Sequence, residues 1–330
     1  MLILAKAVMA IMLGFSFSLV FGYFAIKILN KRHIKQTVSE TLGKRHLEKE
    51  GTPTTGGIIF IIPTVIIMLA LFLTGKIEFS TNLFIVLFVF IAYALLGYVD
   101  DYLIIKRHNN DGLSIFWKLA LQIVIALIFF YIFLSSGNEP VVNIHTLGIK
   151  INLGWFYGMF LLLVLVATSN AVNITDGLDG LAGGLSAIAF FAFGIITWGA
   201  SWAAGNEEVA IFCFVLVGAL VGFLVYNSHP AKIFMGDTGS LSLGAALASV
   251  AIITNHELTL VIVAGVFVIE TLSVIIQWIA LSKFHTKVFL MAPLHHHFEK
   301  LGWAEVDVVR LFWSVGLLLS MAAIAFGVWI

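Results

Sequence analysis

Charged residues are scarce in this chain, and their scarcity excludes a water-soluble globule. Only 11% of the 330 residues are charged and 61% are hydrophobic, which gives a mean hydropathy of +1.06. A soluble domain of this size would need far more polar surface. The sequence therefore predicts an integral membrane protein.

The sequence also lacks a pair of cysteines and a cleavable secretory signal. The chain has one cysteine, Cys213, so no internal disulfide can form and the cysteine content does not indicate a compartment. The first hydrophobic run is too long for a secretory signal, lacks a small-residue cleavage site and is followed by a basic cluster. We expect this run to remain as a membrane anchor.

The chain contains instead a series of apolar runs, each about 18 to 25 residues long, which is the length of a helix that crosses a hydrocarbon core of roughly 30 Å. That length favours helices over a barrel. The predicted fold is an all-α integral membrane protein that forms one polytopic domain, 1–330, with about ten transmembrane helices. The ten runs are 7–29, 56–73, 83–99, 119–134, 155–168, 181–200, 209–226, 241–253, 258–281 and 309–330.

Lysine and arginine are distributed unevenly between the two faces that ten crossings would create. Fifteen of the 18 lie in or beside the loops that follow odd-numbered runs, and the other face holds only Lys6, Lys76 and Lys150. Because positive residues are retained in the cytoplasm, we predict that the odd-numbered loops are cytoplasmic and that both termini lie outside. A basic cytoplasmic face would attract polyanions.

Acidic residues follow alternate apolar runs, so the predicted topology gathers them on the cytoplasmic face. Asp100 and Asp101 follow the third run, Asp176 and Asp179 the fifth, and Asp237 the seventh. Packing unpaired carboxylates together is costly, so the cluster suggests a divalent cation and an anionic substrate, and hence an enzyme.

Each acidic motif also has a plainer explanation, and for Asp176 and Asp179 it is a purely structural, glycine-rich break in a helix. The adjacent pair Asp100 and Asp101 would oppose the macrodipole at the end of a helix. Adjacent acids at a helix end are often solvated residues at the membrane interface. Alternatively, a nearby cation, Lys106, Arg107 or Lys118, would relieve the repulsion between the two carboxylates. Asp237 precedes the eighth run, at the expected start of its helix, where it could be an N-cap and nothing more.

Other polar motifs on this face suggest contacts with a phosphorylated ligand. The segment 51–57, GTPTTGG, opens the second run, and free backbone N–H groups at such a helix start can hold phosphate. An alternative interpretation is that this loop is a basic membrane anchor followed by an ordinary helix start. Asn173, Asp176 and Asp179 recur every three residues and would share a helical face. Phe234 offers an aromatic surface for a base.

Three consecutive histidines, His295, His296 and His297, are the last unusual feature. Neighbours in sequence do not share a helical face and no cysteine is near, which disfavours zinc. We interpret them as contacts to phosphate or sugar oxygens, with a membrane-surface segment as the alternative. In the ninth run, Glu270 and Gln277 lie seven residues apart on one face, an expensive arrangement in lipid unless that face lines a cavity.

Taken in order, GTPTTGG, GYVDDY, NAVNITDGLDGLAGG, IFMGDTGSL and PLHHHFE resemble the motifs of the phospho-N-acetylmuramoyl-pentapeptide transferases, a family of the polyprenyl-phosphate N-acetylhexosamine-1-phosphate transferase superfamily. The resemblance extends over roughly 44–303, and the family's topology agrees with the one predicted from charge. The acidic motifs are shared across the superfamily, whereas PLHHHFE is typical of this family. One departure is that Ile104 and Ile105 precede Lys106, where the family often has a lysine closer to the aspartate pair.

The resemblance implies a Mg²⁺-dependent phosphoglycosyl transferase of the bacterial inner membrane, with its active site on the cytoplasmic face. It would transfer phospho-N-acetylmuramoyl-pentapeptide from UDP-MurNAc-pentapeptide to undecaprenyl phosphate, yielding lipid I and UMP for peptidoglycan synthesis. Catalysis would consist mainly of charge neutralisation and alignment. The lipid bilayer is an expected partner, nucleic acid is not, and a homodimer is left open.

The same resemblance implies roles for individual residues. Asp100 would deprotonate or orient the lipid phosphate, and Asp237 would coordinate Mg²⁺ with support from Asp101 and Asp176. The implied catalytic set is Asp100, Asp101, Lys118, Asp237 and His295. The implied substrate-binding set is Lys49, Thr54, Asn173, Asp176, Asp179, Phe234, Gln277, His296 and His297. Asn173, Asp179 and Phe234 would hold the uridine and diphosphate, and His295, His296 and Gln277 would act near the sugar phosphate.

Two other functions compete with this interpretation. Another branch of the superfamily would move a different hexosamine phosphate onto the same lipid, and the histidine run is the feature that distinguishes the two. A cation-coupled transporter would use the carboxylates as ion sites, but transporters place such residues near the midplane and show an internal repeat. Here the acids lie at the ends of the runs, and the two halves show no repeat.

Overall fold

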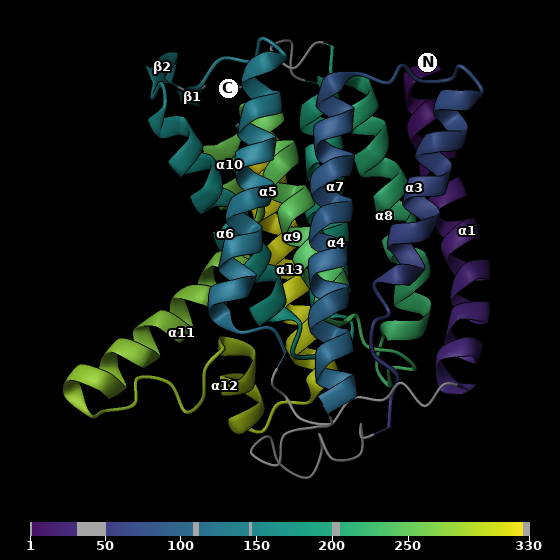
Figure 1. The fold of residues 1–330 in the computed structure, drawn as a ribbon. Coiled ribbons are helices and arrows are strands. Elements are labelled where there is room, and N and C mark those ends of the chain that lie inside the picture. Colours follow the sequence, from purple (N-terminus) through teal and green to yellow (C-terminus); the bar gives the residue numbers. More distant parts are fainter. Residues whose placement is uncertain (1, 32–50, 108–111, 145–146, 200–204, 326–330) are drawn as a thin grey trace.

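The computed structural model describes residues 2–31, 51–107, 112–144, 147–199 and 205–325, and these residues form a bundle of helices (Figure 1). Nine of the described helices are long and apolar enough to cross a membrane, which makes the chain a multi-pass membrane protein. They are α1 (Leu2–Lys31), α4 (Thr81–Arg107), α5 (Ile115–Ser135), α6 (Phe156–Thr175), α7 (Leu181–Gly199), α8 (Glu207–Asn227), α9 (Gly236–Ile253), α11 (Gly265–Phe284) and α13 (Glu305–Ile324).

Three shorter helices complete the described helical part. These are α3 (Ile58–Leu73), α10 (Glu257–Val263) and α12 (Leu294–Lys300). As far as the described residues extend, each of the ten predicted runs coincides with helical structure, but the ninth run is not one continuous helix. It divides at Ala264 into α10 and α11, and α11 then leans away from the bundle (Figure 1). The hydropathy of the run does not reveal this break, because both parts are apolar.

Several helices extend beyond the apolar runs that predicted them, which corrects the placement of the acidic residues. α4 continues to Arg107, so Asp100 and Asp101 lie within a helix rather than at its end. α6 continues to Thr175 and therefore includes Asn173, and α9 begins at Gly236, so Asp237 is in its first turn. Backbone hydrogen bonds do not depend on hydropathy, so a helix can continue into its polar residues.

Two central helices hold the bundle together. α8 packs against α1, α3 and α7, and α9 packs against α4 and α6. α9 is rich in glycine, alanine and serine, and small residues let helix backbones approach closely. A Cβ on Gly97 of α4 would collide with the backbone oxygen of Asp237, so this glycine lets α4 lie directly against the start of α9. The approach brings the acids of both helices together.

One small sheet lies outside the helices and was not predicted. β1 (Val141–Ile144) pairs antiparallel with β2 (Ile149–Asn152), with Val141 opposite Asn152. The start of α1 and the end of α13 lie at the end of the bundle opposite to α12 (Figure 1). This arrangement agrees with an even number of crossings, while the side of the membrane on which the termini lie stays a prediction.

Candidate active site

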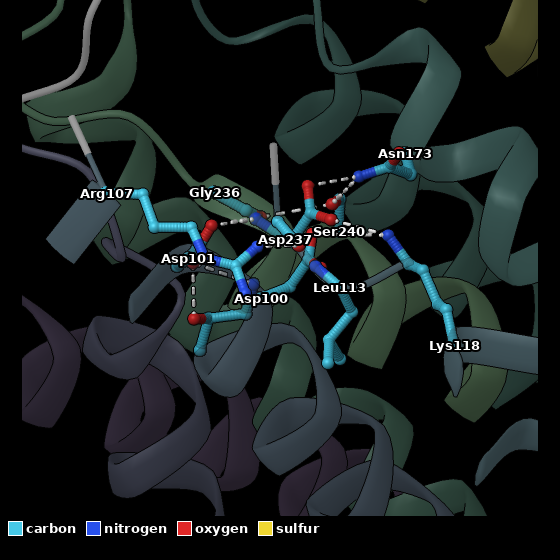
Figure 2. A network of polar contacts seen from close by, with 11 residues as sticks. Asp100, Asp101, Arg107, Leu113, Lys118, Asn173, Gly236, Asp237 and Ser240 are labelled. Carbon is cyan, nitrogen blue, oxygen red and sulfur yellow. Dashed lines mark hydrogen bonds and ion pairs between the residues drawn. The ribbon is translucent and has the colours of Figure 1, made fainter. Parts of the chain in front are cut away.

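Polar residues from four helices meet at the end of the bundle that also carries α12. Asp100 and Asp101 come from α4, Lys118 from the first turn of α5, Asn173 from the last turn of α6 and Asp237 from the first turn of α9 (Figure 2). The structure thus confirms that the acids of the third and seventh predicted runs come together.

Asp237 is the centre of this network. Its Oδ2 accepts a hydrogen bond from Nζ of Lys118 at 2.8 Å, and its Oδ1 accepts one from Nδ2 of Asn173 at 2.8 Å (Figure 2). Asn173 also donates to Oγ of Ser240 at 2.9 Å, one turn further along α9. Asp237 is only partly buried, so its carboxylate remains open to a ligand.

Lys118 bridges two carboxylates. Besides Asp237, its Nζ reaches Oδ2 of Asp100 at 3.4 Å. The backbone N–H of Leu113 donates to the other oxygen of Asp100 at 2.6 Å. Lys118, one of the cations predicted as partners for the aspartate pair, thus forms an ion pair with Asp100. Lys106 is exposed, and its Nζ lies 5.9 Å from the centre of the Tyr102 ring.

Asp101 anchors the start of α9. One oxygen accepts from the backbone N–H of Asp237 at 2.9 Å, and the other accepts from the backbone N–H and Oγ1 of Thr238 at 3.0 and 2.6 Å. A carboxylate is favourable there because the first N–H groups of a helix have no partner within the helix. Asp101 therefore fixes the backbone that carries Asp237.

The segment after α6 does not continue as a helical face. Asp176 is the C-cap of α6, and Gly180 has a φ of +80°, which turns the chain toward α7. Asp179 consequently faces another group: its Oδ2 lies 3.1 Å from Nδ1 of His229, and its backbone N–H donates to Oε1 of Glu305 at 2.7 Å. The prediction that Asn173, Asp176 and Asp179 share one helical face is wrong, because the helix ends at Thr175.

The three histidines have different hydrogen-bond partners, although the rings of His295 and His296 lie side by side with their centroids 4.2 Å apart. His295 is fully buried and contacts Glu270 of α11, with Nδ1 3.1 Å from Oε2. Nδ1 of His296 lies 2.7 Å from Oε2 of Glu299. Nδ1 of His297 accepts from the backbone N–H of Leu290 at 3.1 Å. His295 reaches toward the segment that follows α6, because a Cβ on Gly177 would collide with its Nε2.

In the glycine-rich segment before α3, two backbone N–H groups are bonded to the residues that precede α9. The N–H groups of Gly56 and Gly57 donate to the carbonyls of Phe234 and Met235 at 2.8 and 2.9 Å. The expectation that these N–H groups are free for phosphate is therefore wrong, because they pair with the strand-like segment before α9. Thr54 is buried beside Gly236, and Phe234 is partly buried.

Gln277, another predicted substrate contact, is hydrogen-bonded to the backbone of its own chain. The Gln277 side chain accepts from the N–H groups of Val288 and Phe289 at 3.1 and 2.9 Å and donates to the carbonyl of Phe289 at 3.2 Å. Gln277 therefore holds the segment that follows α11. Lys49 lies outside the described residues.

The residues of the centre offer oxygen ligands, which suit Mg²⁺. Asp237 fits best, because its oxygens accept hydrogen bonds from the side chains of Lys118 and Asn173, which a ligand can displace, whereas the oxygens of Asp101 accept backbone N–H groups. Within the described residues, the one group of three ligand atoms closer than 4.8 Å is Asp179, His229 and Glu305. The set Asp237, Asp101 and Asp176 stays a prediction.

Sequence reasoning missed several residues of the site. Thr238 and Ser240 lie within the motif IFMGDTGSL, but the sequence assigns no role to either of them, nor to His229 or Glu305. Glu270 was noted as a costly carboxylate in an apolar run but was given no role. The period of the helix that begins at Gly236 would have placed Ser240 one turn after Asp237. No local signal pairs Glu305 with Asp179, 126 residues away.

Fold and site define a multi-pass membrane protein whose helix ends assemble an acidic, lysine-bridged centre. Residues 83–255 match Glycosyl transferase family 4. The chain is 46% identical over 324 residues to phospho-N-acetylmuramoyl-pentapeptide-transferase of Geobacillus sp. (strain WCH70), covering 98% of each chain. It is 44% identical over 321 residues to the protein of the same name from Bacillus subtilis (strain 168), covering 97% of each.

The two relatives match nearly the whole chain, and the family match over residues 83–255 spans the acidic centre. The chain belongs to glycosyl transferase family 4 and, within it, to the phospho-N-acetylmuramoyl-pentapeptide-transferases.

Proposed function

We propose that this chain transfers phospho-N-acetylmuramoyl-pentapeptide from UDP-MurNAc-pentapeptide to undecaprenyl phosphate, forming lipid I and UMP, with the acidic centre as its active site. Family membership supports the reaction. The observation that carries the assignment of the site is Lys118 held between Asp100 and Asp237 at a helix-end junction. No comparable observation supports transfer of a different hexosamine phosphate or cation-coupled transport.

The reaction brings a lipid phosphate to a diphosphate, so several negative charges must approach one another. A phosphate monoester has a second pKa of about 6 and is largely ionised at neutral pH, which removes the need for a strong base. Asp100, fixed by Leu113 and Lys118, orients the attacking phosphate. Lys118 can leave Asp237 and pair with the diphosphate, because an ammonium on a flexible stem moves readily between anionic partners.

Mg²⁺ is the proposed cofactor, held by Asp237 with Asp101 and Asp176 in support. When bound, it supplies positive charge to the diphosphate oxygens. Asn173 keeps the Asp237 carboxylate aligned, and Asp101 keeps the first turn of α9 in place. Asn173, Asp179 and Phe234 remain the proposed contacts of the uridine diphosphate, and His295, His296 and His297 those of the phosphosugar.

The test of the reaction is release of UMP from UDP-MurNAc-pentapeptide by the purified chain in detergent with undecaprenyl phosphate. We expect release that requires the lipid, stops with a chelator and returns with Mg²⁺. UDP-GlcNAc in place of the muramoyl substrate is the matched control and should release no UMP. Efficient turnover of UDP-GlcNAc would contradict the proposed substrate, and turnover in the chelator would contradict the cofactor.

We further propose that the centre faces the cytoplasm of a bacterial inner membrane and that 1–330 acts as one unit. The single native cysteine, Cys213, is buried, so single cysteines can be introduced with little background. Lys106→Cys, near the centre, should react with an impermeant maleimide only after the cells are opened. Lys150→Cys, on the exposed strand β2, should react in intact cells. The opposite pattern would reverse the orientation. A homodimer stays a prediction.

A further inference from the structure

Glu270 is a buried carboxylate that has no role in the proposed reaction as described above. It lies in α11, a membrane-crossing helix, and is 0% exposed. A carboxylate in such surroundings is costly unless it is well paired. Both of its oxygens face one residue: Oε1 accepts from the backbone N–H of His295 at 3.1 Å, and Oε2 lies 3.1 Å from Nδ1 of its ring. The two contacts with His295 therefore compensate for the burial of the Glu270 carboxylate.

This contact determines which ring nitrogen of His295 faces outward. An ionised carboxylate only accepts hydrogen bonds, so Nδ1 must carry the proton of the shared bond. Nε2 then points away from Glu270 toward Gly177, which leaves room for the ring because it has no Cβ. Nε2 is buried and has no hydrogen-bond partner among the described residues.

An unpaired polar atom in a buried position needs a partner when the site is filled. Gly177 directly follows Asp176, the C-cap of the helix that carries Asn173. Nε2 therefore lies next to the segment that the proposed function assigns to the nucleotide substrate. A histidine held through one nitrogen by a carboxylate presents the other nitrogen in a fixed direction, as in many catalytic and metal-bound histidines.

We propose that Glu270 is a positioning residue: it holds the His295 ring with Nδ1 protonated, so that Nε2 meets an oxygen of the transferred phosphosugar. This inference rests on the proposed function. Glu270 does not touch the substrate and acts only through His295. The contact also links α11 to the start of α12, so the tilt of α11 and the direction of the histidine are set together.

The kinetic test is a double-mutant cycle with UMP release as the measurement. Glu270→Gln keeps the shape of the side chain but offers only one acceptor oxygen. We expect kcat to fall by about 10- to 100-fold, as is typical when such a supporting group is lost, with KM for the UDP-sugar changed less than twofold. In a His295→Gln background the same substitution should have almost no further effect, because two residues that act as a unit are not additive.

The matched control is Glu208→Gln, a buried carboxylate in the first turn of α8 at the other end of the bundle, which should leave kcat unchanged. Equal losses from Glu270→Gln with and without His295 would overturn the inference. A wild-type chain with no lipid-dependent UMP release would instead overturn the proposed function.

A direct measurement does not depend on turnover. In protein labelled with ¹⁵N-histidine, the His295 resonances are assigned by their loss in His295→Gln. We expect a protonated Nδ1 in the wild type and a shift of the proton toward Nε2 in Glu270→Gln. A wild-type ring with its only proton on Nε2 would overturn the inference. Glu270→Asp, which retains the charge, provides the second variant if Glu270→Gln fails to fold.

Discussion

Asp237→Asn is expected to abolish lipid I formation while leaving the fold intact. Asn keeps the size of the side chain but has one acceptor oxygen and no charge, so it cannot both hold Lys118 and ligate a cation. Loss of a preorganised group that stabilises developing charge costs about 10²- to 10³-fold in kcat. We expect at least that loss in UMP release, with no recovery at high Mg²⁺ concentration.

The control for this variant is Asp307→Asn. Asp307 is also an aspartate in the first turn of a helix, α13, but it is exposed and 3.8 Å from Arg310. It should keep wild-type turnover and thermal stability. Full Mg²⁺-dependent activity of Asp237→Asn would remove Asp237 from the active centre and, with it, the proposed metal site.

The second large effect is expected from Lys118→Gln. The ammonium of Lys118 is the cation between Asp100 and Asp237, so its removal leaves two carboxylates at close range without a compensating charge. We expect turnover to fall by about 10²-fold or more, because the charge that meets the diphosphate is also lost. The melting temperature should fall in a chelator and recover with Mg²⁺, since a divalent cation relieves the same repulsion.

A dependence of stability on Mg²⁺ that is larger in Lys118→Gln than in the wild type is the distinguishing result. Thermal unfolding in detergent, with and without Mg²⁺, measures it. Lys106→Gln is the matched control, because that lysine is exposed at the end of α4 and contacts only the face of Tyr102 in the described part of the chain. If the melting temperature of Lys118→Gln does not respond to Mg²⁺, the cation does not bind between these carboxylates.

The positions of the helices were largely predictable from the sequence, whereas their ends were not. Apolar runs located α4, α6 and α9, because transfer of apolar side chains into lipid is a local property of the sequence. The ends of these helices extend into polar residues, where hydropathy gives no signal. This is why Asp100 was expected at the end of a helix that in fact continues to Arg107, and why the predicted run before Asn173 stops at residue 168 although α6 continues to Thr175.

The composition of the site was also predictable, but the role of each side chain was not. Because successive loops alternate between the two sides of the membrane, counting the crossings placed Asp100, Lys118 and Asp237 on the same side. It did not show that Asp101 anchors the first turn of α9 or that Gln277 holds a loop, since both depend on hydrogen bonds to backbone groups far along the chain. The break at Ala264 likewise arises between two apolar helices, where the pattern of residues does not change.

The sequence by itself determined that this protein resides in a membrane, how many times an apolar segment recurs, and which acids and histidines share one end. These properties follow from side-chain chemistry and from counting crossings, which require no knowledge of packing. The tertiary structure alone decided that Lys118 joins Asp100 to Asp237 and that Glu270 faces His295. Such contacts depend on how each helix is rotated and tilted against its neighbours, and small residues such as Gly97 set that geometry through close approach.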